Sequence, residues 1–301
     1  MSDNENPKVS VISFCLNSGR FLRDTIESVL NQTYNNYEHI IVDGSSTDNT
    51  LEIFKEYSHL RWISEKEEGD NSVLDAIWKG LNMAKGKYMI LLAISDGIYE
   101  KDWFKRSVEI LDADEQISLV WGLSQTISEE GILGKVFGSE YLENNPPQKM
   151  DWLPFWLSNG HGFESNALYR RQVFEICFPK NHPDEPYRFH PALGFNYQFN
   201  TRGYLPYFLP IISMYGRTHE NQRQEEFHDL LDSVSKIYDK DRKIFRKKFL
   251  SGKIGHCFRD GSSKIIKEVT PNQLNSHRRK VLKYRIKHKI KRDVQKFLDH
   301  I

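Results

Sequence analysis

Cysteine is scarce in this sequence. Cys15, Cys177 and Cys257 are the three it contains, far apart and with no CxxC pair. This spacing argues against a disulfide scaffold and against a cysteine-rich zinc site. We therefore expect the protein to work in a reducing, cytoplasmic compartment.

Long apolar runs are missing as well. The longest, from Tyr88 to Ile94, is far shorter than the roughly 20 residues that cross a bilayer. The first ten residues, MSDNENPKVS, are polar and acidic, unlike a secretory signal. Any membrane contact is therefore expected to be peripheral, on the inner face.

Two phosphate-binding motifs are absent. The first strand-to-helix turn reads CLNSGRF and lacks GxGxxG, and GxxxxGK[ST] occurs nowhere in the chain. Both motifs bring backbone N–H groups close to phosphates, so their absence counts against dinucleotide-binding and P-loop enzymes.

Charge of one sign is concentrated at the C-terminus. Residues 278–301 hold ten Lys and Arg against two Asp, about +8, whereas the whole chain carries +1. A basic helix on a mildly acidic body predicts contact with an anionic surface, for which a membrane is favoured. A solvated helix and a nucleic-acid patch are the alternatives; acidic strand ends make nucleic acid an unexpected partner.

Short apolar runs alternate with helical patterns through the first 125 residues. This alternation is typical of an α/β fold with a mostly parallel sheet and helices on both faces. Further helices are predicted around 165–176, 225–250 and 276–298, with irregular loops at 141–165 and 178–195. The predicted strands are 9–14, 39–43, 61–64, 88–93 and 117–121.

Two stretches carry a family resemblance. KVSVISFCLNSGRFLRDTIESVLNQTYNNYEHIIVDGSSTDNT resembles the opening of inverting family-2 glycosyltransferases of the GT-A fold, and EEGDNSVLDAIWKGLNMAKGKYMILLAISDG continues the resemblance. It is strong over 8–97, fragmentary over 150–225, and absent beyond. It implies a Rossmann-like GT-A domain over 1–225, with a nucleotide-sugar half (1–125) and an acceptor half (126–225). Residues 226–301 would form a helical, basic extension.

Asp96 stands where an apolar strand ends. A carboxylate there can bind Mg²⁺ or Mn²⁺, which takes its remaining ligands from phosphates and water, although a turn-capping Asp is the simpler alternative. The resemblance matches Asp96 to the last acid of the family's metal motif, with Ser95 in place of the first. It also matches His219 to a residue that completes the metal or diphosphate site. Arg217 could pair with phosphate.

Three more acids are implied to bind the donor. Asp43 matches the acid that accepts a hydrogen bond from the nucleotide base, although it could instead cap a helix. Gly44 follows it where the family often has a second acid. Asp70 and Asp75 match acids near the ribose and phosphates, and an acid in the first turn of a helix also complements the helix dipole. The sequence departs from the family nearby at Ser72, Val73 and Trp78.

The general base is the least certain residue. The family usually has an Asp where this chain has Gly194, and Asn196 cannot act as a base. Glu164, which matches a second family acid, is the first choice. Trp156 and His161 are predicted to bind the acceptor sugar beside it, although they could instead belong to the core. Asp184, Glu185 and His190 are the alternatives, and a chain with no base is the third possibility.

These observations predict a metal-dependent inverting glycosyltransferase of polysaccharide biosynthesis. It would move a sugar from a nucleotide-diphosphate donor, with a UDP-sugar favoured, to a hydroxyl of a glycan or lipid-linked acceptor. Mn²⁺ or Mg²⁺ would be the cofactor. The alternative is a nucleotide-sugar-binding module of the same fold that has lost catalysis, as the departures at Gly44, Ser72, Val73 and Ser95 would allow.

Overall fold

A computed structural model provides the structure of the chain. It describes residues 6–66, 72–137, 152–159, 167–219 and 228–273, together with positions 275, 276, 279, 286, 290 and 294. Among these residues, no helix combines the length and the apolar character that a membrane span requires.

The first half is built from strands joined by helices. Four strands run parallel in the order β3-β2-β1-β4. β1, β2 and β4 consist largely of β-branched and apolar residues that are buried on both faces of the sheet, as the sequence predicted, whereas β3 is mostly half-buried. The elements are β1 (Val9–Cys15), α1 (Leu22–Leu30), β2 (Tyr37–Asp43), α2 (Thr50–Glu56), β3 (Leu60–Ser64), α3 (Ser72–Met83) and β4 (Tyr88–Leu91).

The sheet continues with mixed directions. Its full order is β3-β2-β1-β4-β8-β6-β9-β5, with β7 paired to β6. β6 and β9 are parallel, whereas β8 is antiparallel to β4 and β6. The predicted α/β, GT-A-like architecture is therefore confirmed. The added elements are β5 (Gly97–Ile98), α4 (Trp103–Ala113), β6 (Ile117–Ile127), β7 (Leu133–Phe137), β8 (Leu168–Arg170) and β9 (Leu205–Arg217).

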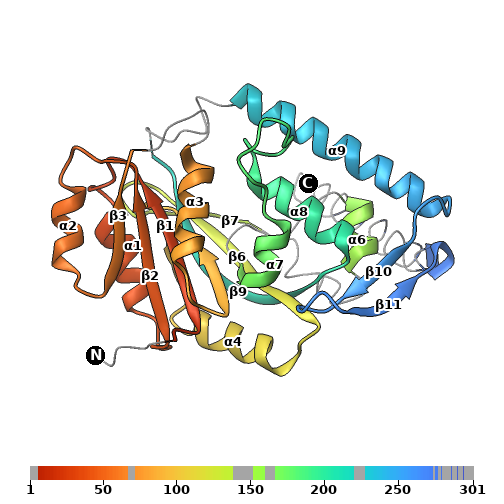
Figure 1. The fold of residues 1–301 in the computed structure, drawn as a ribbon, viewed down its shortest axis with the longest axis horizontal. Helices are drawn as coiled ribbons and strands as arrows, with labels where there is room; N and C mark the ends of the chain where they lie inside the picture. The colour runs from red at the N-terminus through yellow and green to blue at the C-terminus, as the bar shows by residue number, and fades with distance from the viewer. Residues whose placement is uncertain are drawn as a thin grey trace.

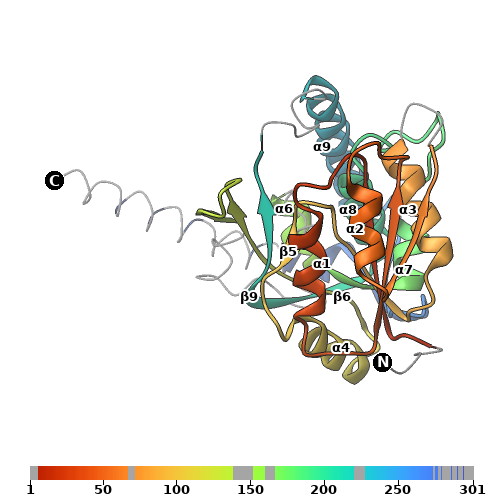
Figure 2. The ribbon, with the colours of Figure 1, turned by 90° about the vertical axis from the view of Figure 1, so that its left-hand side faces the viewer.

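Helices cover both faces of the sheet (Figure 2). Because side chains alternate along a strand, Ile12 packs with α3 on one face, whereas Val11 packs with α4 on the other. α1 and α2 bury Leu22, Ile26 and Phe54 on the α4 side. β1, β2 and β4 end at one edge of the sheet, between these two layers of helices.

The C-terminal elements pack at the side of the molecule away from β1–β3 (Figure 1). The predicted helix at 225–250 is confirmed as α9. However, the extension is not wholly helical, because residues 256–269 form an antiparallel hairpin. The elements are α6 (Trp152–Asn159), α7 (Arg171–Cys177), α8 (Pro191–Arg202), α9 (His228–Leu250), β10 (His256–Arg259) and β11 (Ile265–Val269).

α6 lies inside a stretch that the sequence predicted to be loop. Its described side chains, Trp152 to Leu157, are all buried, so the helix has no polar face and shows no amphipathic period. Pro154 occupies the first helical turn, where the missing N–H costs no intrahelical hydrogen bond. Burial on all sides therefore explains why the prediction was wrong.

Candidate active site

Two turns meet at the edge where β1 and β2 end. Asn17 accepts a hydrogen bond from the backbone N–H of Thr47 through Oδ1 (2.8 Å), and its own N–H donates to Ser46 Oγ (2.7 Å). The backbone of Asn17 is left-handed, with a φ of 50°. These contacts hold the turn after β1 against the turn after β2, and both face the end of the parallel strands.

Asp43, the last residue of β2, is fully buried at this edge. Its carboxylate accepts hydrogen bonds from the hydroxyl and the N–H of Ser46 and from Ser64 Oγ at 2.6 Å. The Cys15 thiol donates to it at 3.5 Å, and burial beside this carboxylate raises the thiol pKa strongly. Asp43 is therefore fixed in orientation by donors from three segments.

Asp96 lies beyond the end of β4, in a turn held by α1. The hydroxyl of Thr25 donates to the carbonyl of Asp96 (2.7 Å) and accepts the N–H of Ser95 (3.2 Å). Ser95 has a left-handed φ of 101°, a conformation that side chains oppose. Gly97 follows because a Cβ there would lie 2.3 Å from the Tyr215 ring. The turn thus fixes the position of the Asp96 carboxylate.

The environment of Asp96 disfavours its charge. Burial raises the pKa of this carboxyl to about 6, and the N–H and the positive charge of Arg217 oppose that rise without cancelling it. The Arg217 N–H donates to Asp96 Oδ1 at 3.2 Å. Within the described part of the chain, Oδ2 has no hydrogen-bond donor. A cation beside Oδ2 would stabilise the ionised carboxylate.

Arg217 ends β9 and connects three segments. Its guanidinium donates to Asp24 Oδ2 (2.6 Å) and to the carbonyls of Ser128 and Glu129 (3.3 and 3.0 Å). It also stacks over the Phe21 ring, 4.7 Å from the centroid. A phosphate would have to replace one of these partners, so in this structure Arg217 acts as a buried tie between β9, the turn after β6 and α1.

His219 lies beside Phe21. The two ring centroids are 5.3 Å apart, which places the imidazole near the N-terminus of α1. Across the described ranges, no group of three or more His, Cys, Asp or Glu side chains converges as a metal site. Asp96 and His219 could therefore supply at most part of a coordination shell.

Asp75 lies in the first turn of α3 and faces the loop that precedes α8. The side-chain amide of Asn181 donates to Asp75 Oδ2 at 2.8 Å, and the Trp78 indole N–H donates to the carbonyl of Pro179 at 2.9 Å. The alternative base residues belong to the same loop. Asp184 is exposed, Glu185 accepts the N–H of Tyr187, and burial lowers the pKa of His190.

Trp156 requires a correction. The sequence assigned it to the acceptor sugar, but its ring is fully buried and its indole N–H donates to the Tyr238 hydroxyl at 2.6 Å. Tyr197, Tyr238 and Phe245 pack around it. No ring face is open to a sugar, so Trp156 is a core residue that anchors α9.

Three predicted site residues lie outside the described residues: Asp70, His161 and Glu164. Conversely, the sequence analysis missed Asp24 and Thr25, which hold Arg217 and the Asp96 turn. The available signal was a polar pair in the first turn of α1, facing the end of the sheet. Their partners lie 71 and 193 residues away, which no local pattern reveals.

Comparison of the sequence with known protein families identifies the family of this chain. The model of "Glycosyl transferase family 2" matches residues 10–178, which include β1, β2, β4 and both carboxylates described above. The chain belongs to this family. The match ends at the C-terminus of α7, so α8, α9 and the β10–β11 hairpin lie beyond it.

Relatives of the family-2 chain share parts of its length. An uncharacterized glycosyltransferase of Haemophilus influenzae is 28% identical over 193 residues, 61% of this chain and 59% of that protein. The putative glycosyltransferase EpsH of Bacillus subtilis is 28% identical over 184 residues, 58% and 51% of the two chains. A Mycobacterium tuberculosis PGL/p-HBAD biosynthesis glycosyltransferase is 33% identical over 119 residues, 38% and 46%. The chain thus spans about half the length of these relatives.

Solved structures confirm the fold. S. aureus TarS 1–349 in complex with UDP-GlcNAc has a TM-score of 0.52 at 16% identity, covering 75% of this chain and 65% of that one. A mannosyltransferase from Pyrobaculum calidifontis in complex with GDP-Man and Mn²⁺ also has a TM-score of 0.52 at 16% identity, covering 81% and 71%. At this identity the likeness establishes a common fold.

Proposed function

We propose that this family-2 enzyme transfers a sugar from a UDP-sugar, with inversion, to a hydroxyl of a glycan or lipid-linked acceptor. The observation that carries the proposal is the placement of Asp43 and Asp96 at the edge of the sheet, each fixed by its own set of hydrogen bonds. Structures of the same fold bind UDP-GlcNAc, or GDP-Man with Mn²⁺.

The residues at this edge fit a divalent cation. Asp96 offers a half-buried carboxylate oxygen, a ligand that Mg²⁺ and Mn²⁺ both accept, and His219 is the second proposed ligand. Burial raises the Asp96 pKa, and a bound cation would reverse that effect. When bound, the ion would stabilise the charge that develops on the departing diphosphate.

The remaining residues would position the donor. Asp43 would accept a hydrogen bond from the base, and the hydroxyls that now orient it would keep its carboxylate in place. Asp70, Asp75 and Ser95 would lie along the ribose and phosphates. Arg217 would support the site by fixing Asp96 through its N–H, rather than by holding phosphate.

The general base is proposed to be Glu164. It would take the acceptor's proton as the hydroxyl attacks, an effect of roughly 10²–10⁴-fold on the rate. Glu164→Gln should lower transfer by that amount and leave nucleotide affinity unchanged. Glu185→Gln is the matched control, since it changes the same group on the loop before α8. Loss of transfer in the control alone would assign the base to that loop.

The rival function is a binding module without turnover. Incubation with UDP-sugars and Mn²⁺ separates the two, because an enzyme releases UDP by transfer or slow hydrolysis whereas a binder shows affinity alone. Asp96→Asn should abolish both the release of UDP and the gain in UDP affinity that Mn²⁺ gives wild type. If calorimetry shows that metal strengthens UDP binding equally in both proteins, Asp96 is not the ligand.

We also propose that residues 278–301 hold the enzyme at an anionic membrane. Ile286, Ile290 and Val294 are helical and are each more than half exposed. Their spacing of four residues places them on one face of a helix, among ten basic residues. Each basic residue near such a surface contributes about 1 kcal/mol.

Deleting residues 278–301 tests this attachment. The truncated protein should stay with the supernatant when phosphatidylserine vesicles are pelleted at low salt, whereas the full chain should pellet and be released by high salt. Hydrolysis of the donor in solution should be unchanged. Equal pelleting of the two proteins would contradict the membrane role.

A further inference from the structure

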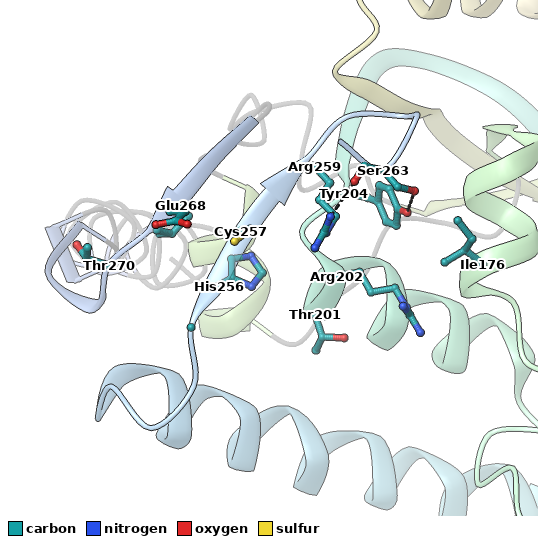
Figure 3. Close-up of a pocket in the computed structure, with 12 residues that line it drawn as sticks. Ile176, Thr201, Arg202, Tyr204, His256, Cys257, Arg259, Ser263, Glu268 and Thr270 are labelled. Atoms are coloured by element: carbon teal, nitrogen blue, oxygen red, sulfur yellow. Dashed lines mark hydrogen bonds between the residues drawn. The ribbon is translucent and has the colours of Figure 1, made fainter. Parts of the chain in front are cut away.

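A pocket of about 660 Å³ lies beside Tyr204, the residue before β9, whereas Arg217 lies at the other end of that strand. Figure 3 shows residues that line this pocket. An extended strand of 13 residues measures about 40 Å, so this pocket is well separated from the catalytic edge. It is formed mainly by the end of α8 and the β10–β11 hairpin, which lie beyond the family match, together with Ile176 of α7, which lies inside it. Its polar lining includes Thr201, Arg202, Tyr204, Arg259, Ser263 and Glu268.

One end of the pocket is positively charged. Arg202 and Arg259 both line the pocket together with Tyr204, so two guanidinium groups border the same cavity. Burial raises the pKa of the Tyr204 phenol, and the charges of both arginines act against that rise. The hydroxyl groups of Ser263 and Tyr204 are hydrogen-bonded, with 2.6 Å between the two oxygens. The Ser263 carbonyl accepts a hydrogen bond from Arg259 Nη1 at 2.7 Å. In Figure 3, Arg259, Tyr204 and Ser263 lie together.

Both guanidinium groups have N–H donors that no acceptor among the described residues uses. Arg202 donates through Nε to Gln198 Oε1 (3.2 Å), and the N–H groups of Gly203 and Tyr204 donate to the carbonyls of Asn200 and Phe199. Neither Nη of Arg202 nor Nη2 of Arg259 has an acceptor among the residues that the structure describes. Such planar, charged donors suit the paired oxygens of a phosphate or carboxylate.

The other end of the pocket has a different chemistry. Glu268 and Thr270 lie on the far side of β10 from Arg259 in Figure 3. Glu268 pairs with Cys257 across the hairpin and is the one carboxylate in the described lining. A carboxylate accepts hydrogen bonds, and the donors that a saccharide offers are its hydroxyl groups. The two ends therefore favour a molecule that is anionic at one end and rich in hydroxyls at the other.

We propose that this pocket binds an anionic saccharide. The phosphate or carboxylate would lie between Arg202 and Arg259, and the sugar hydroxyls would face Glu268 and Thr270. The volume is in the range of small-molecule sites. The proposal is independent of the transfer reaction, because none of these residues belongs to the catalytic edge.

Calorimetry with three probes tests the proposal: glucose 6-phosphate, glucuronate and neutral glucose. Wild type should bind at least one of the two anions, and whichever binds more tightly identifies the anionic group. Arg202→Gln and Arg259→Gln should each weaken that binding about tenfold or more, because each removes a charge-assisted hydrogen bond. Arg202 is exposed, so its variant should fold even if the Arg259 variant disturbs the hairpin.

Two controls make the result specific. Lys267→Gln removes the same charge from β11 outside the pocket lining and should bind the anions as wild type does. Asp96→Asn should also bind them normally, which separates this pocket from the donor site. The proposal fails if glucose binds as tightly as both anions, if no anion binds at millimolar concentration, or if Arg202→Gln has no effect.

Discussion

Two regions of the molecule differ in how their polar groups are satisfied: the nucleotide edge, which is the end of β2 and β4 with Asp43 and Asp96, and the C-terminal half, with the aromatic cluster around Trp156. In the C-terminal half, three buried side chains donate hydrogen bonds to side-chain partners: Trp156 to Tyr238, Trp152 to Asn200, and Tyr187 to Asp241. At the nucleotide edge, Asp96 keeps one oxygen without a donor among the described residues, and its charge is disfavoured.

The difference lies in whether a polar group finds its hydrogen-bond partners within the fold. A satisfied polar pair within an aromatic cluster fixes one arrangement of the core. A buried carboxylate with a raised pKa costs stability until a ligand reaches it, and such costs are typical of functional sites. Removing the Asp96 charge and truncating the aromatic cluster should therefore change stability with opposite signs.

The largest effect is expected in the aromatic half. Trp156→Ala should lower the free energy of unfolding by about 3–5 kcal/mol, because it empties a fully buried site. UDP affinity of the folded protein should be unchanged. Urea unfolding and calorimetry measure the two quantities, with Ile237→Ala on the exposed side of α9 as the control. A selective loss of UDP affinity would instead return Trp156 to the site.

Asp96→Asn should instead raise the free energy of unfolding. Because the folded pKa of about 6 exceeds the ordinary value of 3.8, the carboxyl costs nothing below about pH 4 and destabilises the fold as pH rises through 6. Removing the charge should therefore stabilise the metal-free protein at pH 7 by up to about 3 kcal/mol. Unfolding in EDTA at pH 4 and pH 7 checks the prediction; the two proteins should differ more at pH 7.

Asp24→Ala should cost about 1–2 kcal/mol. It removes the carboxylate partner of buried Arg217, but Asp24 itself is half-exposed, so solvent screens much of the interaction. The carbonyls of Ser128 and Glu129 still hold the guanidinium. Thermal unfolding of the single variants and of the Asp24→Ala/Arg217→Lys pair measures their coupling; strictly additive losses would show that the pair does not interact.

The smallest effect is expected for Tyr238→Phe, about 1 kcal/mol or somewhat more. It removes one hydroxyl and leaves the Trp156 indole N–H without its acceptor in a buried site. Denaturant unfolding detects a change of this size, and Tyr99→Phe, on an exposed ring, serves as the control. An unchanged midpoint would mean that the indole finds another acceptor.

The sequence predicted the first half well for a physical reason. Strands β1, β2 and β4 are buried on both faces and therefore read as apolar runs, and Asp43 and Asp96 follow two of these runs directly. The hairpin at 256–269 was missed although Asp260 and Gly261 form a typical turn pair between its strands. Its two strands, of four and five residues, are too short to give a clear pattern. The hydrogen bonds from Arg170 to the carbonyls of Leu111 and Ile117 were also missed, because they join segments that are far apart in the sequence.

The left-handed backbone of Ser95 affects how readily the turn after β4 changes its conformation. A left-handed serine lies about 1–3 kcal/mol above a relaxed one and persists because Thr25 holds it from α1. That energy corresponds to a factor of about 5–150 between two populations. The turn after β4 can therefore also adopt a relaxed conformation. Breaking the hydrogen bonds of Thr25 would be enough to allow it. Thr25 on α1 therefore sets the balance between two shapes of the turn that carries Asp96.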